Sequence, residues 1–309
     1  MLLRCHGVTT MTSSSSPSLP LAAEPAVGTA FQRAGFWRRL LRRPGSRLAL
    51  AWLVLLLATA ILAPWVGRLD PLSGGSDALL PPLSASHWLG TDDLGRDVWA
   101  RVVHGSRISL IVGVASALLA VAVGVAVGAL AGYFGGLLDA VLMRTAEFFQ
   151  TLPRFVVALI VIALYGTSVA KMVMVIAALS WPQLARVVRA SVASLRQSQF
   201  VEAARVAGMG HGGIILREIL PNVAAPIIVL GSLDIAMAIL IEASLSFFGL
   251  GDPNLVSWGT MLNEAQQYLR DAWWMSVFPG LAIALTVLGF NLMGDALNDA
   301  LNPRGESFR

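Results

Sequence analysis

The chain has 309 residues, of which 56% are apolar and only 13% are charged, and its mean hydropathy is +0.71. Soluble domains contain roughly 45–50% apolar and about 25% charged residues, so this composition excludes an ordinary water-soluble domain. The net charge is +4, but the arginines lie beside long apolar runs, which favours membrane orientation and argues against nucleic acid as a partner. The single cysteine, Cys5, excludes an internal disulfide and any multi-cysteine metal site.

The N-terminal stretch differs from the rest of the chain because it is rich in Ser, Thr, Pro and Ala. It lacks the apolar core behind a basic start that a signal peptide requires. An arginine cluster between Arg33 and Arg47 then leads directly into the first apolar run. We therefore expect residues 1–47 to form a cytoplasmic tail that is partly disordered and has a basic juxtamembrane end.

The apolar runs that follow are long enough to cross the ~30 Å hydrocarbon core of a bilayer. The run at 155–185 fits either one tilted span or two short ones. Arginines before residue 48 and after residue 185 should both be cytoplasmic, so this run must contribute two crossings to keep the number between them even. The sequence therefore predicts six transmembrane helices, at residues 48–66, 108–133, 148–166, 170–188, 223–250 and 275–295.

The predicted fold is an all-α polytopic membrane protein, because no segment shows the two-residue alternation of a β-strand. Residues 48–300 form the transmembrane domain in this prediction, and residues 301–309 form a short cytoplasmic tail. Both termini are then cytoplasmic, and most of the 22 basic residues lie on the inner side of the membrane.

An outer loop between the first two predicted spans holds four side chains that could ligate a metal: His87, Asp92, Asp93 and Asp97. No pair among them has the spacing of a structural zinc site, and the chain has no HExxH motif. We therefore expect a folded loop with ion pairs and glycine turns, and no metal site.

The inner loop at 196–221 connects the fourth and fifth predicted spans. Its pattern predicts a short helix at 200–207, a glycine turn, and a second short helix at 214–220 that stops at Pro221. One face of the first helix would carry the apolar residues Phe200, Ala203, Ala204 and Ala207. From the residues alone, a knob that docks into a partner protein and a surface loop with basic anchors are both open interpretations.

Nothing in the chain predicts catalysis. The stretch from Gly208 to Gly213 matches GxGxxG formally, but a short helix precedes it where a dinucleotide site needs a strand. The only lysine, Lys171, is followed by Met172, so there is no Walker A loop. None of the four histidines lies in a predicted span, which argues against an intramembrane protease. We expect a non-catalytic chain that binds no cofactor, so ATP-driven transport would need a partner ATPase.

Two acidic residues, Asp234 and Glu242, lie inside the fifth predicted span. An ionisable group at mid-membrane costs roughly 2.5–3.5 kcal/mol, so each is a functional candidate. Counted from Asn222, Asp234 lies about 18 Å into the span, near the midplane, and Glu242 lies near its outer boundary. We favour bonding between helices for Glu242. For Asp234, such bonding and a place on a translocation path are both open.

Several of these motifs together resemble the C-type permease subunits of ABC importers for dipeptides, oligopeptides and nickel. Six residues of the inner loop are similar to the EAA motif of these permeases: Glu202, Ala203, Ala204, Gly208, Leu220 and Pro221. Further matching stretches lie at 87–97, 105–110, 132–144, 242–251, 258–263 and 291–295. Glu147 departs from the family, which usually has Asp there, but it keeps the charge.

The resemblance implies the type I ABC importer permease fold in a bacterial inner membrane. The chain would form a pore with a homologous B-type permease, above two cytosolic ABC ATPases that use ATP and Mg. A periplasmic or lipid-anchored binding protein would deliver the substrate. The EAA segment would be the coupling helix that docks on the ATPase. Di- and oligopeptides, glutathione and nickel chelates are all open as substrates.

A second class of function also fits part of the sequence. An ion-coupled secondary transporter would act alone, with Asp234 as its coupling site. The EAA loop and the lack of inverted-repeat symmetry count against this alternative.

Overall fold

The computed structural model describes residues 33–66, 70–84 and 87–301, and these form an all-α structure without a strand. Residues 1–32 of the predicted N-terminal tail and residues 302–309 of the predicted C-terminal tail lie outside the described residues. The predictions for these two end segments therefore stay predictions, whereas the predicted membrane domain is described almost throughout.

Five helices are long and apolar enough to cross a membrane, and one bent pair makes a sixth crossing if it counts as a single span. The five are α2 (Pro44–Ile61), α4 (Val98–Phe134), α7 (Val169–Leu195), α10 (Leu220–Leu245) and α12 (Trp274–Leu301). The short elements are α1 (Arg33–Leu40), α3 (Ala63–Val66), α8 (Gln199–Val206), α9 (His211–Gly213), η1 (Ile214–Ile219), η2 (Ser246–Leu250), α11 (Trp258–Ala265) and η3 (Gln266–Tyr268). The predicted all-α polytopic architecture is confirmed.

The bent pair replaces the straight helix expected at 148–166. It consists of α5 (Gly136–Thr151) and α6 (Arg154–Tyr165), which meet at an angle of 83°. Pro153 lies in the break, and it has no backbone N–H to donate to a continuous helix. It also disfavours helical geometry in the residue before it, and Leu152 is extended, with a ψ of 134°.

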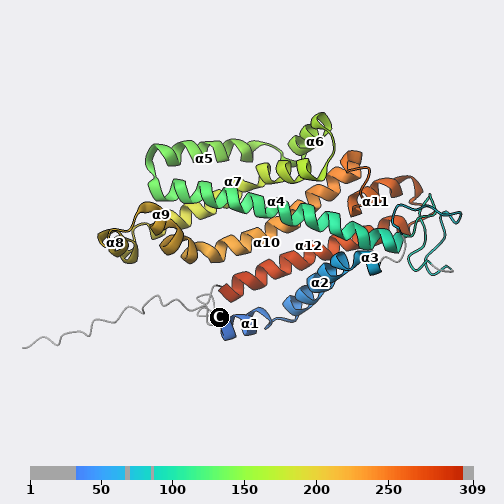
Figure 1. Ribbon diagram of the computed structural model, residues 1–309, viewed down its shortest axis with the longest axis horizontal. Helices are drawn as coiled ribbons and strands as arrows, with labels where there is room; N and C mark the ends of the chain where they lie inside the picture. Colours follow the sequence, from blue (N-terminus) through green and yellow to red (C-terminus); the bar gives the residue numbers. More distant parts are fainter. Residues whose placement is uncertain (1–32, 67–69, 85–86, 302–309) are drawn as a thin grey trace, which may run out of the picture.

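The chain turns back sharply between α4 and α5. Gly135 and Gly136 have φ angles of 69° and 60°, which glycine adopts without strain. Figure 1 shows α5 returning along α4 and α7. Residues 136–147, which the sequence analysis places between two spans, therefore belong to α5 and pack against α4 and α7.

α4 starts well before the apolar run predicted at 108–133. Its first residue is Val98, and the carboxylate of Asp97 accepts a hydrogen bond from the backbone N–H of Ala100 as an N-cap. A helix of 37 residues is about 55 Å long, so α4 extends beyond a ~30 Å hydrocarbon core. Hydropathy detects only the part that the lipid requires to be apolar.

Three glycines one helical turn apart, Gly124, Gly128 and Gly132, bring α4 against α7. A Cβ on Gly128 would lie 2.5 Å from the carbonyl oxygen of Ala185, and one on Gly132 would lie 2.6 Å from that of Arg189. No side chain fits between these backbones, which is how small residues allow close packing of membrane helices.

The two ends of the bundle differ in content. α8 and α9 lie at one end, and the loop at 70–97 lies at the opposite end (Figure 1). α1 and the C-terminal end of α12 lie in the half nearer to α8. Arg43, in the turn between α1 and α2, forms an ion pair of 2.9 Å with Asp299 of α12. The two described ends of the chain therefore lie on the same side of the bundle as α8.

Candidate functional site

The second helix of the inner loop does not stop at Pro221, contrary to the prediction. From His211 the helical segment continues past Pro221 through α10 and into η2, where Gly249 leaves helical geometry with a φ of 82°. The turn before the proline is the π-helical segment η1, in which the N–H of Leu220 bonds to the carbonyl of Ile215. A proline is tolerated in the first turn of a helix, and Pro221 follows the wider π turn at the start of α10.

The first helix of the loop, α8, presents a different apolar face from the predicted one. Its inner face packs on the bundle through Phe200, Val201 and Ala204. Its outer face, by which we mean Glu202, Ala203, Val206 and Ala207, is exposed to solvent. Because the fully buried Val201 lies at the centre of the inner face, Ala203 and Ala207 are turned outward, and the predicted single stripe is wrong.

Gly208 ends α8 with a φ of +79°, in the left-handed region that favours glycine. A Cβ built on Gly208 would meet no atom within 4 Å, so the requirement for glycine is conformational and not steric. The N–H of Gly208 bonds to the carbonyl of Arg205, and that of Met209 bonds to the carbonyl of Ala204. The turn therefore fixes where the second helix begins.

Four side chains hold the inner loop against the bundle. The hydroxyl of Tyr133, at the end of α4, lies 2.8 Å from Nδ1 of His211. Arg196, just after α7, donates to the carbonyl of Tyr133 at 3.0 Å. The guanidinium of Arg205 on α8 lies 5.8 Å from the centre of the Tyr133 ring. We call these four residues the inner clamp.

Sequence reasoning missed the inner clamp. The sequence patterns bear on His211 only as one of the four histidines outside the predicted spans, and on Tyr133 only as part of the matching stretch at 132–144. The signal that could have found it is the pair of large polar side chains that flank glycine turns at 132–136 and 208–213. An open hollow of about 410 Å³ lies beside the clamp and is also lined by Glu202.

The remaining residues that resemble the EAA motif are Leu220, Pro221 and Glu202, and they differ in burial. Leu220 is half-buried and packs in the cluster beneath α8, whereas Pro221 is exposed. Glu202 lies in the first turn of α8, but the helix has no side-chain cap at Ser198. Among the described residues, Glu202 has no hydrogen-bond or ion-pair partner, so its carboxylate is free to meet another protein.

Glu242 bonds between helices, as the sequence analysis favours. Its side chain is buried, with the residue only 1% exposed. The carboxylate accepts hydrogen bonds from the hydroxyls of Ser109 on α4, at 3.0 Å, and Ser246, at 2.9 Å. A buried carboxylate that is bonded in this way fixes α10 against α4.

Asp234, the other acidic residue of α10, lies in different surroundings. It is half-buried, and no hydrogen-bond or ion-pair partner exists for it among the residues that the structure describes. Its helix, α10, packs against α6, whose first residue is Arg154. Among the described residues no neighbouring helix bonds to the Asp234 carboxylate, and a place on a translocation path stays a prediction.

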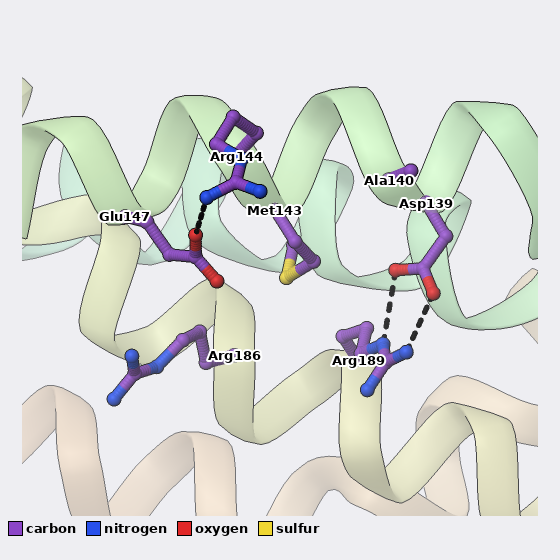
Figure 2. A pocket seen from close by; sticks show the side chains of 7 residues that line it. All are labelled: Asp139, Ala140, Met143, Arg144, Glu147, Arg186 and Arg189. Carbon is purple, nitrogen blue, oxygen red and sulfur yellow. Dashed lines mark hydrogen bonds and ion pairs between the residues drawn. The ribbon is translucent and has the colours of Figure 1, made fainter.

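A charged hollow of about 370 Å³ opens between α5 and α7 (Figure 2). Arg189 of α7 holds the carboxylate of Asp139 with two hydrogen bonds, of 2.9 and 2.5 Å. Arg144 pairs with Glu147 along α5 at 3.2 Å. Arg186 points into the same hollow without a partner among the described residues, and it is exposed.

The outer loop is folded by ion pairs, as predicted. The carboxylate of Asp92 accepts from both Arg96 and Arg101, at 2.6 Å each, and both arginines also reach Glu264. His87 and Asp97 lie 3.0 Å apart. Within the described part of the chain, no group of three or more potential ligands could hold a metal ion. This network ties the loop to the start of α4 and to α11.

Comparison with known proteins assigns the family. Residues 124–306 match the model of the binding-protein-dependent transport system inner membrane component. Residues 31–82 match the N-terminal transmembrane domain of oligopeptide transport permease C.

Full-length relatives agree with these family matches. A glutathione transport system permease protein GsiD from Pectobacterium atrosepticum is 40% identical over 94% of this chain and 96% of its own length. A putative peptide transport system permease protein from Brucella suis is 37% identical over 96% and 98%. A di/tripeptide transport system permease protein DppC from Pseudomonas aeruginosa is 38% identical over 87% and 91%. The chain thus belongs to the family of inner-membrane permease components of binding-protein-dependent ABC importers.

Proposed function

We propose that the chain is one of two pore-forming subunits of an ATP-driven importer for di- or oligopeptides or for a related small solute such as glutathione. A homologous B-type permease would complete the pore. Two cytosolic ATPases would supply the energy, and a periplasmic or lipid-anchored binding protein would select the substrate. The relatives named for peptide and glutathione transport support this substrate class, and a nickel chelate is the most distant candidate.

The observation that carries the proposal is the contrast between the two faces of α8. The inner face is fixed to the bundle, and the outer face carries small side chains and an unpaired carboxylate, with Val206 90% exposed. A short helix with a small apolar outer surface fits a groove on a partner. We infer that Glu202, Ala203, Ala204, Gly208, Leu220 and Pro221 form the ATPase-coupling loop.

The inner clamp gives a physical route for coupling. A push on α8 would reach α4 through Arg205, whose guanidinium lies over the ring of Tyr133, and through the contact between His211 and the Tyr133 hydroxyl. Arg196, just after α7, bonds the carbonyl of Tyr133 and so passes the movement from α4 to α7. α4 and α7 are locked together by their glycine contacts, so they move as one unit. ATP-driven closure of the ATPases would thereby change the access of the central path.

In this assembly the chain is non-catalytic. ATP and Mg are bound by the partner ATPases, and this chain contributes no cofactor site. The orientation that follows has α8 and both termini in the cytoplasm and the loop at 70–97 outside the inner membrane.

Reconstitution tests the proposal. The chain is co-expressed with a B-type permease, ATPases and a binding protein encoded beside it, and the complex is placed in proteoliposomes. Uptake of labelled dipeptide, tripeptide and glutathione is expected to need ATP, the binding protein and both ATPases. Uptake by this chain alone, driven by an ion gradient, would overturn the importer and favour a secondary transporter with Asp234 as the coupling site.

A further inference from the structure

Three polar side chains lie on three helices that pack against one another, α6, α7 and α10. Arg154, at the start of α6, donates a hydrogen bond of 3.2 Å to the side-chain oxygen of Gln183 on α7. Asp234 lies on α10, which packs against both α6 and α7, and the charge of Arg154 is near enough to act on it. We call Arg154, Gln183 and Asp234 the polar triad.

Two members of the triad, Gln183 and Asp234, lie at matching depth. Gln183 is twelve residues before the inner end of α7 at Leu195, which is about 18 Å along the helix. Asp234 is twelve residues after Asn222, which is also about 18 Å from the inner side. Both positions are far from either end of a ~30 Å hydrocarbon core.

A charged group at this depth does not face lipid. Charged residues within spans almost always point to a bundle interior or a water-filled cavity, because the hydrocarbon gives them no hydrogen bonds. Gln183 is exposed, and Arg154 and Asp234 are half-buried, so the triad is open on the surface of this chain. That surface must meet water between this chain and another subunit.

The polar surface continues toward the inner side. Arg186 follows Gln183 by three residues and therefore lies on the same face of α7. It opens into the charged hollow between α5 and α7 (Figure 2). At the bend between α5 and α6, the side-chain nitrogen of Gln150 is buried without a protein partner. Water in this region would satisfy that donor.

We propose that the polar triad is a substrate contact on the translocation path that holds both charged ends of a zwitterionic solute. The guanidinium of Arg154 takes the carboxylate, because it can offer two parallel N–H donors. The carboxylate of Asp234 takes the ammonium group. Peptides and glutathione carry both groups, so the inference rests on the proposed function and names what the path recognises.

Thiol labelling of the assembled complex tests the water-filled path directly. In a Cys5→Ser background, Gln183→Cys places a thiol beside Arg154. We expect charged methanethiosulfonate reagents to modify it, with the anionic reagent about tenfold faster than the cationic one because of the local positive charge. Leu118→Cys, on the apolar surface of α4, is the control and is expected not to react.

The Arg154→Gln change distinguishes the effect of the arginine charge on thiol labelling from the accessibility of the thiol to water. It should abolish the preference of Gln183→Cys for the anionic reagent, and Arg154→Lys should restore it. In uptake assays, Arg154→Gln should lower transport of a free dipeptide at least severalfold, while the ATPases still co-purify. Arg270→Gln, an exposed arginine on the outer side, serves as the control and should behave like the parent.

The outcomes distinguish the triad from the proposed function. If the parent complex takes up peptide with ATP but Gln183→Cys does not react, the path lies elsewhere and the triad proposal is wrong. If Gln183→Cys reacts at equal rates with the anionic and the cationic reagent, Arg154 does not act as the carboxylate contact. If the parent complex shows no ATP-dependent uptake of any zwitterion, the proposed function itself fails.

Discussion

Gly208 shows how one residue can set the geometry of a whole surface. Its φ of +79° costs an ordinary side chain roughly 1–2 kcal/mol, whereas Asn tolerates this region better. A Cβ at Gly208 meets no neighbour, so the bundle itself should fold in any variant. The consequence of a substitution falls on the angle between α8 and α9, and therefore on the outer face of α8.

We predict that Gly208→Val weakens ATPase co-purification or uncouples ATP hydrolysis from uptake, and that Gly208→Asn retains much of both. The measurement is ATP-dependent uptake in proteoliposomes beside the amount of co-purified ATPase. Loss of about 1.4 kcal/mol at the interface lowers affinity tenfold. Normal uptake with Gly208→Val would mean that this turn is a plain surface connection.

Glu242 makes a different prediction, because its role is internal. Glu242→Ala leaves the hydroxyls of Ser109 and Ser246 without their buried acceptor, so we expect a loss of about 1–3 kcal/mol in stability. Glu242→Gln keeps an acceptor oxygen and should lose less. The check is the thermal unfolding midpoint of the detergent-purified complex. Ser244→Ala is the control, since that hydroxyl bonds only to a carbonyl of its own helix; an equal shift in both would argue against the assigned role.

At the scale of elements, hydropathy predicts which segments cross the membrane but not how they are shaped. The run at 148–166 is apolar enough for one helix, yet Pro153 bends it and two glycines return α5 into the bundle. α4 starts at Val98 because an Asp97 cap, and not apolarity, fixes its first turn. Such helix boundaries depend on single capping and proline residues. A hydropathy pattern taken over many positions does not detect the effect of one residue.

The inner loop shows the other limit of sequence reasoning. Its residues and its glycine turn could be identified, but the face that α8 exposes depends on Val201 finding a tertiary cluster. The glycine turns beside Tyr133 and His211 are visible in the sequence, but the contact between the two side chains is not predicted, because they are 78 residues apart and their contact depends on the path of α4 and α7. The bonding of Glu242 could be anticipated, because a buried carboxylate requires a partner.

The contact between α4 and α7 leads to a prediction for glycine-to-alanine changes that is opposite to what helix propensity alone would give. Alanine is favoured over glycine in a helix by up to about 1 kcal/mol. At Gly128, however, the added Cβ would lie 2.5 Å from a carbonyl oxygen, so we expect Gly128→Ala to destabilise the complex by about 1–3 kcal/mol. Gly280→Ala in α12, where a Cβ meets nothing within 4 Å, should be neutral or stabilising. Thermal unfolding midpoints of the two variants should move apart; a common direction would refute the packing argument.

At the scale of the whole molecule, the charges are sorted by end and by function. The outer end holds a closed network of Asp92, Arg96, Arg101 and Glu264, in which Arg101 is only 2% exposed. The inner end holds open groups, such as Glu202 and the arginines of the clamp. Charges that are ion-paired with one another within the chain suit a rigid support. Exposed charges without an ion-pair partner suit a surface that meets another protein.

Orientation in the membrane gives the last prediction. The excess of arginines around α1 and the inner loop predicts that this end faces the cytoplasm. Ser76, in the loop at the far end, and Asn254, before α11, are both exposed and should face outward. Gln197, between α7 and α8, is also exposed but should face inward.

In the Cys5→Ser background, Ser76→Cys and Asn254→Cys should therefore react with an impermeant thiol reagent applied to intact spheroplasts. Gln197→Cys should react only after the membrane is opened or in inside-out vesicles, and that second reaction is the control for thiol accessibility. Because all three positions are exposed, a failure to label from one side reports the membrane and not burial. Labelling of Gln197→Cys from outside would contradict an even number of crossings before α8, and the bent pair α5–α6 could then no longer count as one span.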